Sequence, residues 1–388
     1  MRNPLSKLVT EIEPSGIRKF FDIVTEMKDA ISLGVGEPDF DTPWHIREEG
    51  IYSLEKGRTF YTSNSGLKDL REEISLYLKR RFSLQYSPEQ EIIVTVGGSE
   101  AIDIALRAML DEGDEVIIPQ PCFVSYVPCA RLAGGVPVII DLKEENEFRL
   151  TAKELEEAIT PKTKILFLAF PNNPTGAIMT KTDLEAIAKL VIEHDLYVIS
   201  DEIYAELSYD GDHVSIATLP GMWERTVVIS GFSKSHAMTG WRLGYACGPE
   251  LIIAQMLKIH QFAIMCAPTT SQFAAVSAMR YGDPDVENMR ESYNQRRRYL
   301  LHEFERLGIK CFTPLGAFYV FPNISKYHMT SEEFANRLLM EEKVAMVPGT
   351  AFGACGEGFL RVSYAASLEK LKKAIERIER FINRLEDE

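Results

Sequence analysis

One lysine lies in a segment whose residue types suit covalent chemistry with a carbonyl compound. Lys234 follows directly on the β-rich run Thr226–Ser230 and is flanked by small polar residues and an aromatic. Most lysines are solvated and charged, but an amine that loses its water at the end of a strand has a lowered pKa and can form a Schiff base. Arg242 lies eight residues further along the chain. The segment therefore offers an amine that can act as a nucleophile, with an arginine close by.

The sequence VGGSEA (residues 96–101) has the pattern of a strand that runs through two glycines into a helix. The free amides at the start of such a helix and the helix dipole both favour negative charge, so Gly98 and Ser99 are candidates for binding a phosphate. The sequence lacks the GK(S/T) of a Walker loop and the GxGxxG of a dinucleotide-binding turn. Glycines followed by an N-cap serine also form ordinary turns, so the segment alone leaves both interpretations open.

Two more polar segments follow apolar runs. PNNPTG (residues 171–176) has the composition of a turn, although Asn173 also offers a donor and an acceptor to a ligand. Asp201 and Tyr204 lie in DEIY, where the aspartate ends an apolar run. A carboxylate in this place is poorly solvated unless a cation pairs with it, while a helix N-cap or a salt bridge would explain it without any function.

These segments belong to a regular alternation of short β-rich runs and amphipathic stretches between about Glu91 and Gly248. Such alternation predicts βαβ units, and hence an α/β fold with a mainly parallel sheet covered by helices on both faces. Ligands of such sheets bind beyond the carboxyl ends of the strands, where the polar segments lie. The expected strands are 92–96, 115–119, 136–141, 164–170, 196–200, 226–230 and 243–247, and the expected helices between them include 99–110, 151–159 and 183–194.

The last hundred residues have a different pattern, with long charged helices expected over 288–307 and 367–385. The apolar residues of the final helix recur at three- and four-residue spacing, which favours packing onto its own domain over a coiled-coil seam of so few heptads. We therefore expect three parts. Residues 1–45 form an N-terminal arm and part of a small domain, residues 46–285 form a large α/β domain, and residues 286–388 form a smaller α+β domain.

The composition limits the function classes. The 388 residues include 43 Lys plus Arg and 57 Asp plus Glu, a formal net charge of −14, which argues against a nucleic-acid partner because such proteins carry basic patches. No run approaches the roughly 18 apolar residues of a membrane span, and the first residues lack the apolar stretch of a secretory signal. The six cysteines and seven histidines show no metal-ligand spacing, so we expect a cytoplasmic protein without a membrane segment or a metal.

Taken in order, the segments resemble a known family. SGFSKSHAMTGWRLG (residues 230–244) resembles the cofactor-lysine signature of fold-type-I, pyridoxal-phosphate-dependent aminotransferases of class I/II, the aspartate/aromatic type. GGSEA, NNPTG and DEIY match the same family, as do GEPDF (residues 36–40) and FLRVSYA (residues 359–365). The resemblance extends from Ile17 to the last helix. The ordered combination is specific, although each motif alone is weak.

The resemblance implies pyridoxal 5'-phosphate as the cofactor and assigns residues that would hold it. Lys234 would form a Schiff base with the cofactor aldehyde, and Asp201 would pair with the pyridinium nitrogen and keep it protonated. Asn173 and Tyr204 would donate to the phenolic oxygen, which stabilises its anion and lowers the pKa of the Schiff base. The phosphate would be bound by Arg242, the amides of Gly98 and Ser99, and a serine beside the lysine.

The resemblance also implies how substrates and a second subunit take part. Arg361 matches the arginine that binds the substrate α-carboxylate, a bidentate task that a lysine performs poorly. Gly36 would lie beside that carboxylate, where its missing side chain leaves room, and Asn173 would face the same region. Phe123 matches the aromatic ring that stacks on the cofactor beside the substrate. Tyr61 matches the tyrosine lent to the neighbouring subunit's phosphate, which implies a homodimer with shared active sites.

Two departures from the family pattern concern the cofactor site. Some members have the phosphate-binding serine three residues before the lysine, where this chain has Gly231, with Ser230 and Ser233 on either side. Either serine can take the role, and we favour Ser233. Phe123 stands where other members have tryptophan or tyrosine, which keeps the stacking face and removes a hydrogen-bonding group.

We expect a pyridoxal-phosphate-dependent aminotransferase that moves an amino group between an aromatic or dicarboxylic L-amino acid and a 2-oxo acid such as 2-oxoglutarate. The route is ping-pong, with Lys234 first as anchor and then as acid and base for the Cα proton. A C–S β-lyase would use the same residues. A cofactor-sensing regulator would need a DNA-binding module, and no basic helix-turn-helix segment precedes Gly36; a nicotinamide dehydrogenase would need GxGxxG.

The amino donor is not specified by these motifs. The side-chain pocket would be formed by residues 15–20, Phe123 and residues of the partner chain, none of them diagnostic. Arg18 is a candidate for binding a distal carboxylate, with a surface cation as the alternative interpretation. Aromatic amino acids, aspartate or glutamate, and an acylated diaminopimelate of lysine biosynthesis all remain open.

Overall fold

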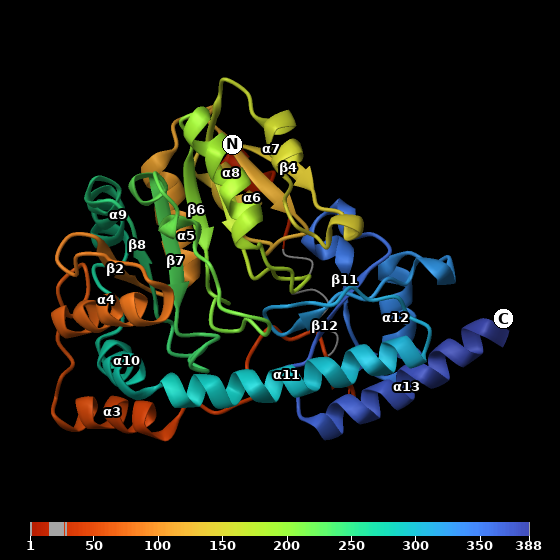
Figure 1. Cartoon of the computed structure of the whole chain (residues 1–388). Helices are drawn as coiled ribbons and strands as arrows, with labels where there is room; N and C mark the ends of the chain where they lie inside the picture. The colour runs from red at the N-terminus through yellow and green to blue at the C-terminus, as the bar shows by residue number, and fades with distance from the viewer. Residues whose placement is uncertain (1, 15–26, 28, 388) are drawn as a thin grey trace.

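Seven strands form one central sheet in the computed structural model, which describes residues 2–14, 27 and 29–387 (Figure 1). From one edge to the other they are β2 (Ile92–Thr95), β8 (Gly244–Cys247), β7 (Thr226–Gly231), β6 (Tyr197–Asp201), β5 (Thr163–Ala169), β3 (Glu115–Gln120) and β4 (Val136–Asp141). All neighbouring pairs are parallel except the two that β8 forms. The predicted α/β fold with a mainly parallel sheet is confirmed, and the expected strands agree with the observed ones to within one residue at each end.

The inner strands are apolar on both faces because helices cover both. Alternate residues of β5 show this, since Leu166 and Leu168 pack in one core cluster while Ile165 and Phe167 pack in another. The first cluster includes α8 (Lys181–Glu193), and the second includes α5 (Gly98–Met109). Side chains of a strand alternate between faces, so these helices lie on opposite sides of the sheet.

The other helices before the C-terminal region are short or surround the β2 edge of the sheet (Figure 1). None of the helices in the described ranges combines the length and the apolar composition that crossing a bilayer requires. The bounds are α1 (Lys7–Thr10), α3 (Trp44–Glu55), α4 (Lys68–Phe82), α6 (Tyr126–Leu132), α7 (Ala152–Ala158), α9 (Glu250–Ala263) and α10 (Thr269–Tyr281).

The C-terminal residues form a second, smaller sheet with its own core. It contains β9 (Tyr319–Val320), β11 (Val347–Pro348) and β12 (Leu360–Ser363), all antiparallel. Beside it, β1 (Ile31–Ser32) pairs with β10 (Val344–Ala345), so a segment from the start of the chain lies against its end. The core is closed by α12 (Ser331–Glu342) and by α13 (Leu368–Asp387), whose apolar face is buried as its spacing predicts.

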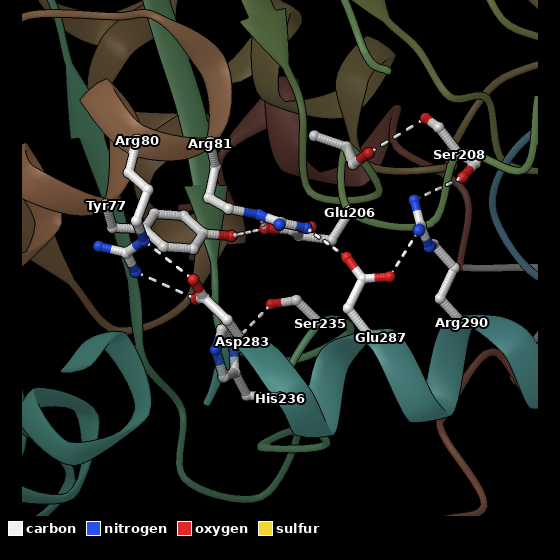
Figure 2. A network of polar contacts seen from close by, with 11 residues as sticks. Tyr77, Arg80, Arg81, Glu206, Ser208, Ser235, His236, Asp283, Glu287 and Arg290 are labelled. Atoms are coloured by element: carbon white, nitrogen blue, oxygen red, sulfur yellow. Dashed lines mark hydrogen bonds and ion pairs between the residues drawn. The ribbon is translucent and has the colours of Figure 1, made fainter. Parts of the chain in front are cut away.

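The long helix α11 (Asp283–Arg306) runs from the β2 side of the main sheet to the C-terminal core (Figure 1). Its first turns are held by a polar network centred on Glu206, a buried residue of the loop after β6 (Figure 2). Arg81 of α4 donates to both carboxylate oxygens of Glu206, at 3.0 and 2.6 Å, and also to Glu287 of α11 at 3.0 Å. Tyr77 donates to Glu206 as well. The nearly buried carboxylate of Glu206 is thus paired with a bidentate cation and a hydroxyl donor.

We predict that Arg81→Ala lowers the free energy of unfolding by about 3 kcal/mol, because the change leaves Glu206 buried without its cation. Urea unfolding at a fixed protein concentration measures the effect. Arg107→Ala is the control, since Arg107 forms an exposed pair with Asp103 on α5, a type of contact that contributes only a few tenths of a kcal/mol. Equal losses in the two variants would contradict the role given to Arg81.

Candidate functional site

The carboxyl ends of the central strands open into a cavity of about 420 Å³. Part of its lining lies at or just beyond the ends of β5, β6 and β7, namely Asn173, Asp201 and Lys234. Arg242 lies just before β8, and because β8 is antiparallel to its neighbours this residue reaches the same edge of the sheet. Another part of the lining comes from the C-terminal core and includes Arg361 of β12. Segments that are far apart in sequence thus face one space.

The glycine turn before α5 allows its backbone to lie against β8 and Arg242. Gly97 has a positive φ of 82°, and a Cβ built on it would lie 2.8 Å from a terminal nitrogen of Arg242. A Cβ on Gly244 would lie 2.6 Å from the backbone nitrogen of Gly98. No side chain caps α5, so the amides of Gly98 and Ser99 begin the helix beside the Arg242 guanidinium. Uncapped amides, the helix dipole and a guanidinium form a site for a phosphate dianion.

Asp201 is a buried carboxyl group at the last residue of β6. Its Oδ2 accepts a hydrogen bond from the Tyr126 hydroxyl at 2.8 Å, and its Oδ1 accepts one from the Ile203 amide at 3.1 Å. Burial raises the pKa of Asp201 to about 6, although both hydrogen bonds oppose that shift. Burial thus makes the ionised carboxylate costly, and a protonated ring nitrogen beside it would stabilise that form.

Lys234 follows β7 and lines the cavity, where its Nζ donates to the carbonyl oxygen of Gly36 at 2.6 Å. Burial lowers the pKa of Lys234 to about 8, and the positive charges of Arg361 and Arg242 act in the same direction. The carboxylate of Glu37 opposes the shift. A substantial fraction of the amine is therefore neutral near pH 8, as a nucleophile requires.

Arg361 is almost fully buried, with 2% of its surface exposed. It donates to Asn173 Oδ1 at 2.8 Å and to the Gly34 carbonyl oxygen at 2.5 Å. The rings of Tyr319 and Phe352 each lie 4.6 Å from its guanidinium carbon. Its Nε is buried without a hydrogen-bond partner. A fixed guanidinium with an unused donor, at the wall of a cavity, is suited to bind a carboxylate.

Most of the site residues that the sequence predicts lie together. The residues of this set that line the cavity are Gly36, Gly98, Ser99, Phe123, Asn173, Asp201, Tyr204, Ser233, Lys234, Arg242 and Arg361. Ser230 does not line it, and its hydroxyl contacts the Glu202 carbonyl oxygen at 3.5 Å instead. Tyr61 is 80% exposed and lies away from the cavity of its own chain. Arg18 and the rest of residues 15–20 lie outside the described residues.

Four further residues of the cavity were not singled out by their sequence patterns. Tyr126 holds Asp201, Tyr319 contacts both Tyr204 and Arg361, and Thr239 donates to Glu37. Glu37 belongs to GEPDF and Thr239 to SGFSKSHAMTGWRLG, so both lie within motifs named above, and Tyr126 stands three residues after Phe123. Tyr319 lies in an apolar run, GAFYVF, that is typical of a core strand. Nothing in such a run distinguishes a tyrosine that faces a ligand from one that packs in the core.

The residues present fit a pyridoxal phosphate group. Its phosphate, ring nitrogen and aldehyde require an anion site, a carboxylate and an amine, and these are offered by the α5 N-terminus with Arg242, by Asp201 and by Lys234. The unused Nε of Arg361 leaves a donor for a substrate carboxylate. Across residues 2–14, 27 and 29–387, no three histidine, cysteine, aspartate or glutamate side chains are grouped so as to hold a metal ion.

Fold and site together define an α/β enzyme of the pyridoxal-phosphate-dependent transferase type. The model of the family described as aminotransferase class I and II matches residues 28–378. The chain belongs to this family, as its motifs predicted. It is an amino acid aminotransferase that uses pyridoxal 5'-phosphate, with amino acids and 2-oxo acids as substrates.

Relatives cover essentially the whole chain. YugH of Bacillus subtilis (strain 168), whose name assigns it to the aminotransferases, is 54% identical over 99% of this chain and 100% of its own length. An aspartate aminotransferase of Pyrococcus abyssi is 49% identical over 96% of each protein. Among solved structures, an aromatic aminotransferase of Pyrococcus horikoshii is 46% identical with a TM-score of 0.90, over 95% of this chain and 99% of that one.

We predict that Asp201→Asn stabilises the cofactor-free protein at neutral pH. The pKa of Asp201 is higher in the folded chain than its usual value of 3.8, so the folded state binds the proton more tightly than the unfolded state. The stability that this carboxyl contributes is present below pH 4 and is lost as pH rises through about 6. A shift of this size corresponds to a gain for Asn of up to about 3 kcal/mol at pH 7.5.

Urea unfolding of the cofactor-free protein at pH 4.5 and pH 7.5 measures this difference. Asp111→Asn is the control, because the Asp111 side chain is 92% exposed and should show little change at either pH. An equal effect of Asp201→Asn at the two pH values would contradict the assignment.

Proposed function

We propose that the chain transfers an amino group between an aromatic or dicarboxylic L-amino acid and a 2-oxo acid such as 2-oxoglutarate, with the two substrates using one site in turn. The observation that carries this proposal is the convergence of Lys234, Asp201 and Arg361 on one cavity. These three side chains offer an amine, a carboxylate and a carboxylate-binding cation, which amino-group transfer needs within reach of one substrate.

The cofactor would be held through its three polar ends. Arg242, the amides of Gly98 and Ser99, and the Ser233 hydroxyl bind the phosphate in this proposal, while Asp201 accepts a hydrogen bond from the ring nitrogen. Asn173 and Tyr204 donate to the phenolic oxygen, and Phe123 packs on the ring face. Ser233 is favoured over Ser230 because only Ser233 lines the cavity.

Pyridoxal phosphate, when bound, supplies an aldehyde that condenses with amines and a ring that accepts the electrons of a bond broken at Cα. Lys234 anchors it and, once released, its neutral amine takes the Cα proton and returns it as an ammonium group. A pKa of about 8 suits both directions of this transfer near neutral pH. Arg361 fixes the substrate carboxylate, and the low exposure of its surroundings excludes water.

The charged residues that line the cavity limit the range of amino donors that it can bind. The cations among the described lining residues are Lys234, Arg242 and Arg361, and each has a role in the scheme above. Ile102 and Phe123 add apolar surface to the lining of the cavity, which suits an aromatic side chain. A distal carboxylate would need a further cation from residues 15–26 or from a partner. The names of the relatives, which include aspartate and aromatic aminotransferases, support both donor classes.

We propose that two copies of the chain form a homodimer with shared active sites. We also propose that each chain has the three parts expected from the sequence. Tyr61 is 80% exposed and next to Phe60, which is equally exposed. Other large apolar side chains with high exposure are Trp44, Leu54, Leu251 and Phe262. If these side chains lie together on one face, their exposed apolar surface fits an interface between two copies of the chain. The partner's Tyr61 would then reach the phosphate site.

We predict that Lys234→Ala abolishes the visible absorbance of the lysine-bound cofactor and lowers turnover by roughly 10³-fold or more, because anchor and proton carrier are lost together. Spectral titration with pyridoxal phosphate and an amino-transfer assay measure both. Lys153→Ala, which removes a lysine that is 83% exposed, is the control. Turnover that survives Lys234→Ala would overturn the proposed mechanism.

The donor is identified by supplying a panel of aromatic, dicarboxylic and diaminopimelate-type amino acids with 2-oxoglutarate and following the cofactor spectrum. We expect conversion with aromatic and dicarboxylic donors. Incubation with cysteine conjugates and no acceptor separates a β-lyase, since only elimination would release pyruvate and ammonia. Release of these products without an acceptor, and no conversion by the panel, would contradict amino transfer.

Mixed dimers test the shared site. Lys234→Ala and Tyr61→Ala chains are each expected to be poorly active alone, but their hybrid carries one site with both native residues. We therefore predict that mixing and refolding the two chains restores up to about a quarter of the wild-type activity, since half of the dimers are hybrids with one complete site each. No recovery in a hybrid that chromatography shows to have formed would contradict the sharing.

A further inference from the structure

Two buried tyrosines meet in the cavity wall. The hydroxyl oxygens of Tyr204 and Tyr319 are 2.7 Å apart, and Tyr319 has no exposed surface. Tyr204 belongs to the segment after β6, whereas Tyr319 begins β9 in the C-terminal core. The contact therefore joins the segment that carries Asp201 to the part of the protein that carries Arg361.

The two hydroxyls carry two protons but share one hydrogen bond. Within the described residues neither hydroxyl has a second hydrogen-bond partner. If Tyr204 turns its proton toward a ligand in the cavity, its oxygen is left as an acceptor and Tyr319 becomes the donor. That arrangement uses both protons, whereas the reverse leaves one of them without an acceptor in a buried site.

The ring of Tyr319 is fixed by its neighbours. The Arg361 guanidinium carbon lies 4.6 Å from the ring centroid, and the Phe318 ring packs edge-on at 4.9 Å. A Cβ on Gly36 would lie 2.5 Å from the Tyr319 hydroxyl oxygen. The absence of a side chain on Gly36 therefore makes room for this hydroxyl, whose one hydrogen-bond partner among the described residues is Tyr204.

We propose that Tyr319 is a positioning residue, whose hydroxyl donates to Tyr204 and directs the Tyr204 proton to the phenolic oxygen of the bound cofactor. The inference rests on the proposed function, in which Tyr204 is a donor to that oxygen. Hydrogen bonds in a chain polarise and strengthen one another. Tyr319 thus helps to stabilise the phenolic anion without touching it, and it lowers the pH at which the visible absorbance of the bound cofactor changes.

The test is a pH titration of the visible absorbance in the cofactor-loaded protein, a readout that needs no turnover. Tyr319→Phe removes only the hydroxyl and keeps the ring on Arg361. We expect it to raise the midpoint of the titration by about half a pH unit. Tyr364→Phe is the matched control, because Tyr364 is also fully buried in the C-terminal core but bonds to a backbone carbonyl oxygen away from the cavity. Its midpoint should not move.

A double-mutant cycle separates positioning from a general structural effect. If Tyr319 acts through Tyr204, adding Tyr319→Phe to Tyr204→Phe should leave the midpoint where Tyr204→Phe alone puts it. Gly36→Ala, which displaces the hydroxyl without deleting it, should raise the midpoint in the same direction. Tyr319→Phe should also lower kcat more than it raises KM, whereas Tyr319→Leu, which loses the ring against Arg361, should raise KM as well.

An unchanged midpoint in Tyr319→Phe, or a full shift on top of Tyr204→Phe, would overturn the proposal. A failure of the proposed function has a different result, since wild-type protein would then lack the lysine-dependent visible absorbance that Lys234→Ala removes. The two failures are therefore distinguished by the wild-type spectrum.

Discussion

The buried position of Lys234, near two arginines, lowers the pKa of its amine to about 8, so the neutral form that the proposed nucleophile needs is available near that pH. Burial also raises the pKa of Asp201 to about 6, so the ionised form of this carboxyl group is costly in the ligand-free site. A cofactor with an anionic phosphate and a cationic ring nitrogen would complement both groups. The electrostatics of the cavity are thus arranged for a ligand that brings charges of its own.

This arrangement depends on neighbouring residues that fix the charged side chains through hydrogen bonds and ring contacts. Tyr126 and the Ile203 amide fix Asp201, and the Glu206 network ties the segment after β6 to α4 and α11 (Figure 2). Arg361 is held between two aromatic rings and by Asn173, which leaves its Nε for a ligand. Groups whose supports are rigid lose little entropy when a ligand binds, and this is how a site achieves the geometry that proton transfer requires.

The central sheet could be predicted almost to the residue because its strands are buried on both faces and carry a continuous apolar signal. Lys234, Asp201 and Asn173 could be predicted as candidate site residues because their motifs occur in an order that resembles one family, although each motif alone also has a structural explanation. Tyr319 and Tyr126 could not, since an aromatic residue in an apolar run or on a helix is usually part of the core. The sequence could not distinguish Ser230 from Ser233 as the residue that faces the cavity. The two lie only three positions apart, and the direction of each hydroxyl depends on the three-dimensional course of the backbone.

The fold class, the family and the types of side chain that line the cavity can be read from the sequence, because periodic burial and strand-end motifs are local signals. Which of these residues meet depends on how the chain packs in three dimensions. Arg361 and Asn173 are 188 positions apart in the chain, yet a guanidinium nitrogen of Arg361 donates to Asn173 Oδ1 at 2.8 Å. The space beside Gly36 goes to a hydroxyl 283 residues away, a close approach that no local pattern encodes. Contacts of this kind arise when two cores pack against each other, so their geometry is a property of the packed chain.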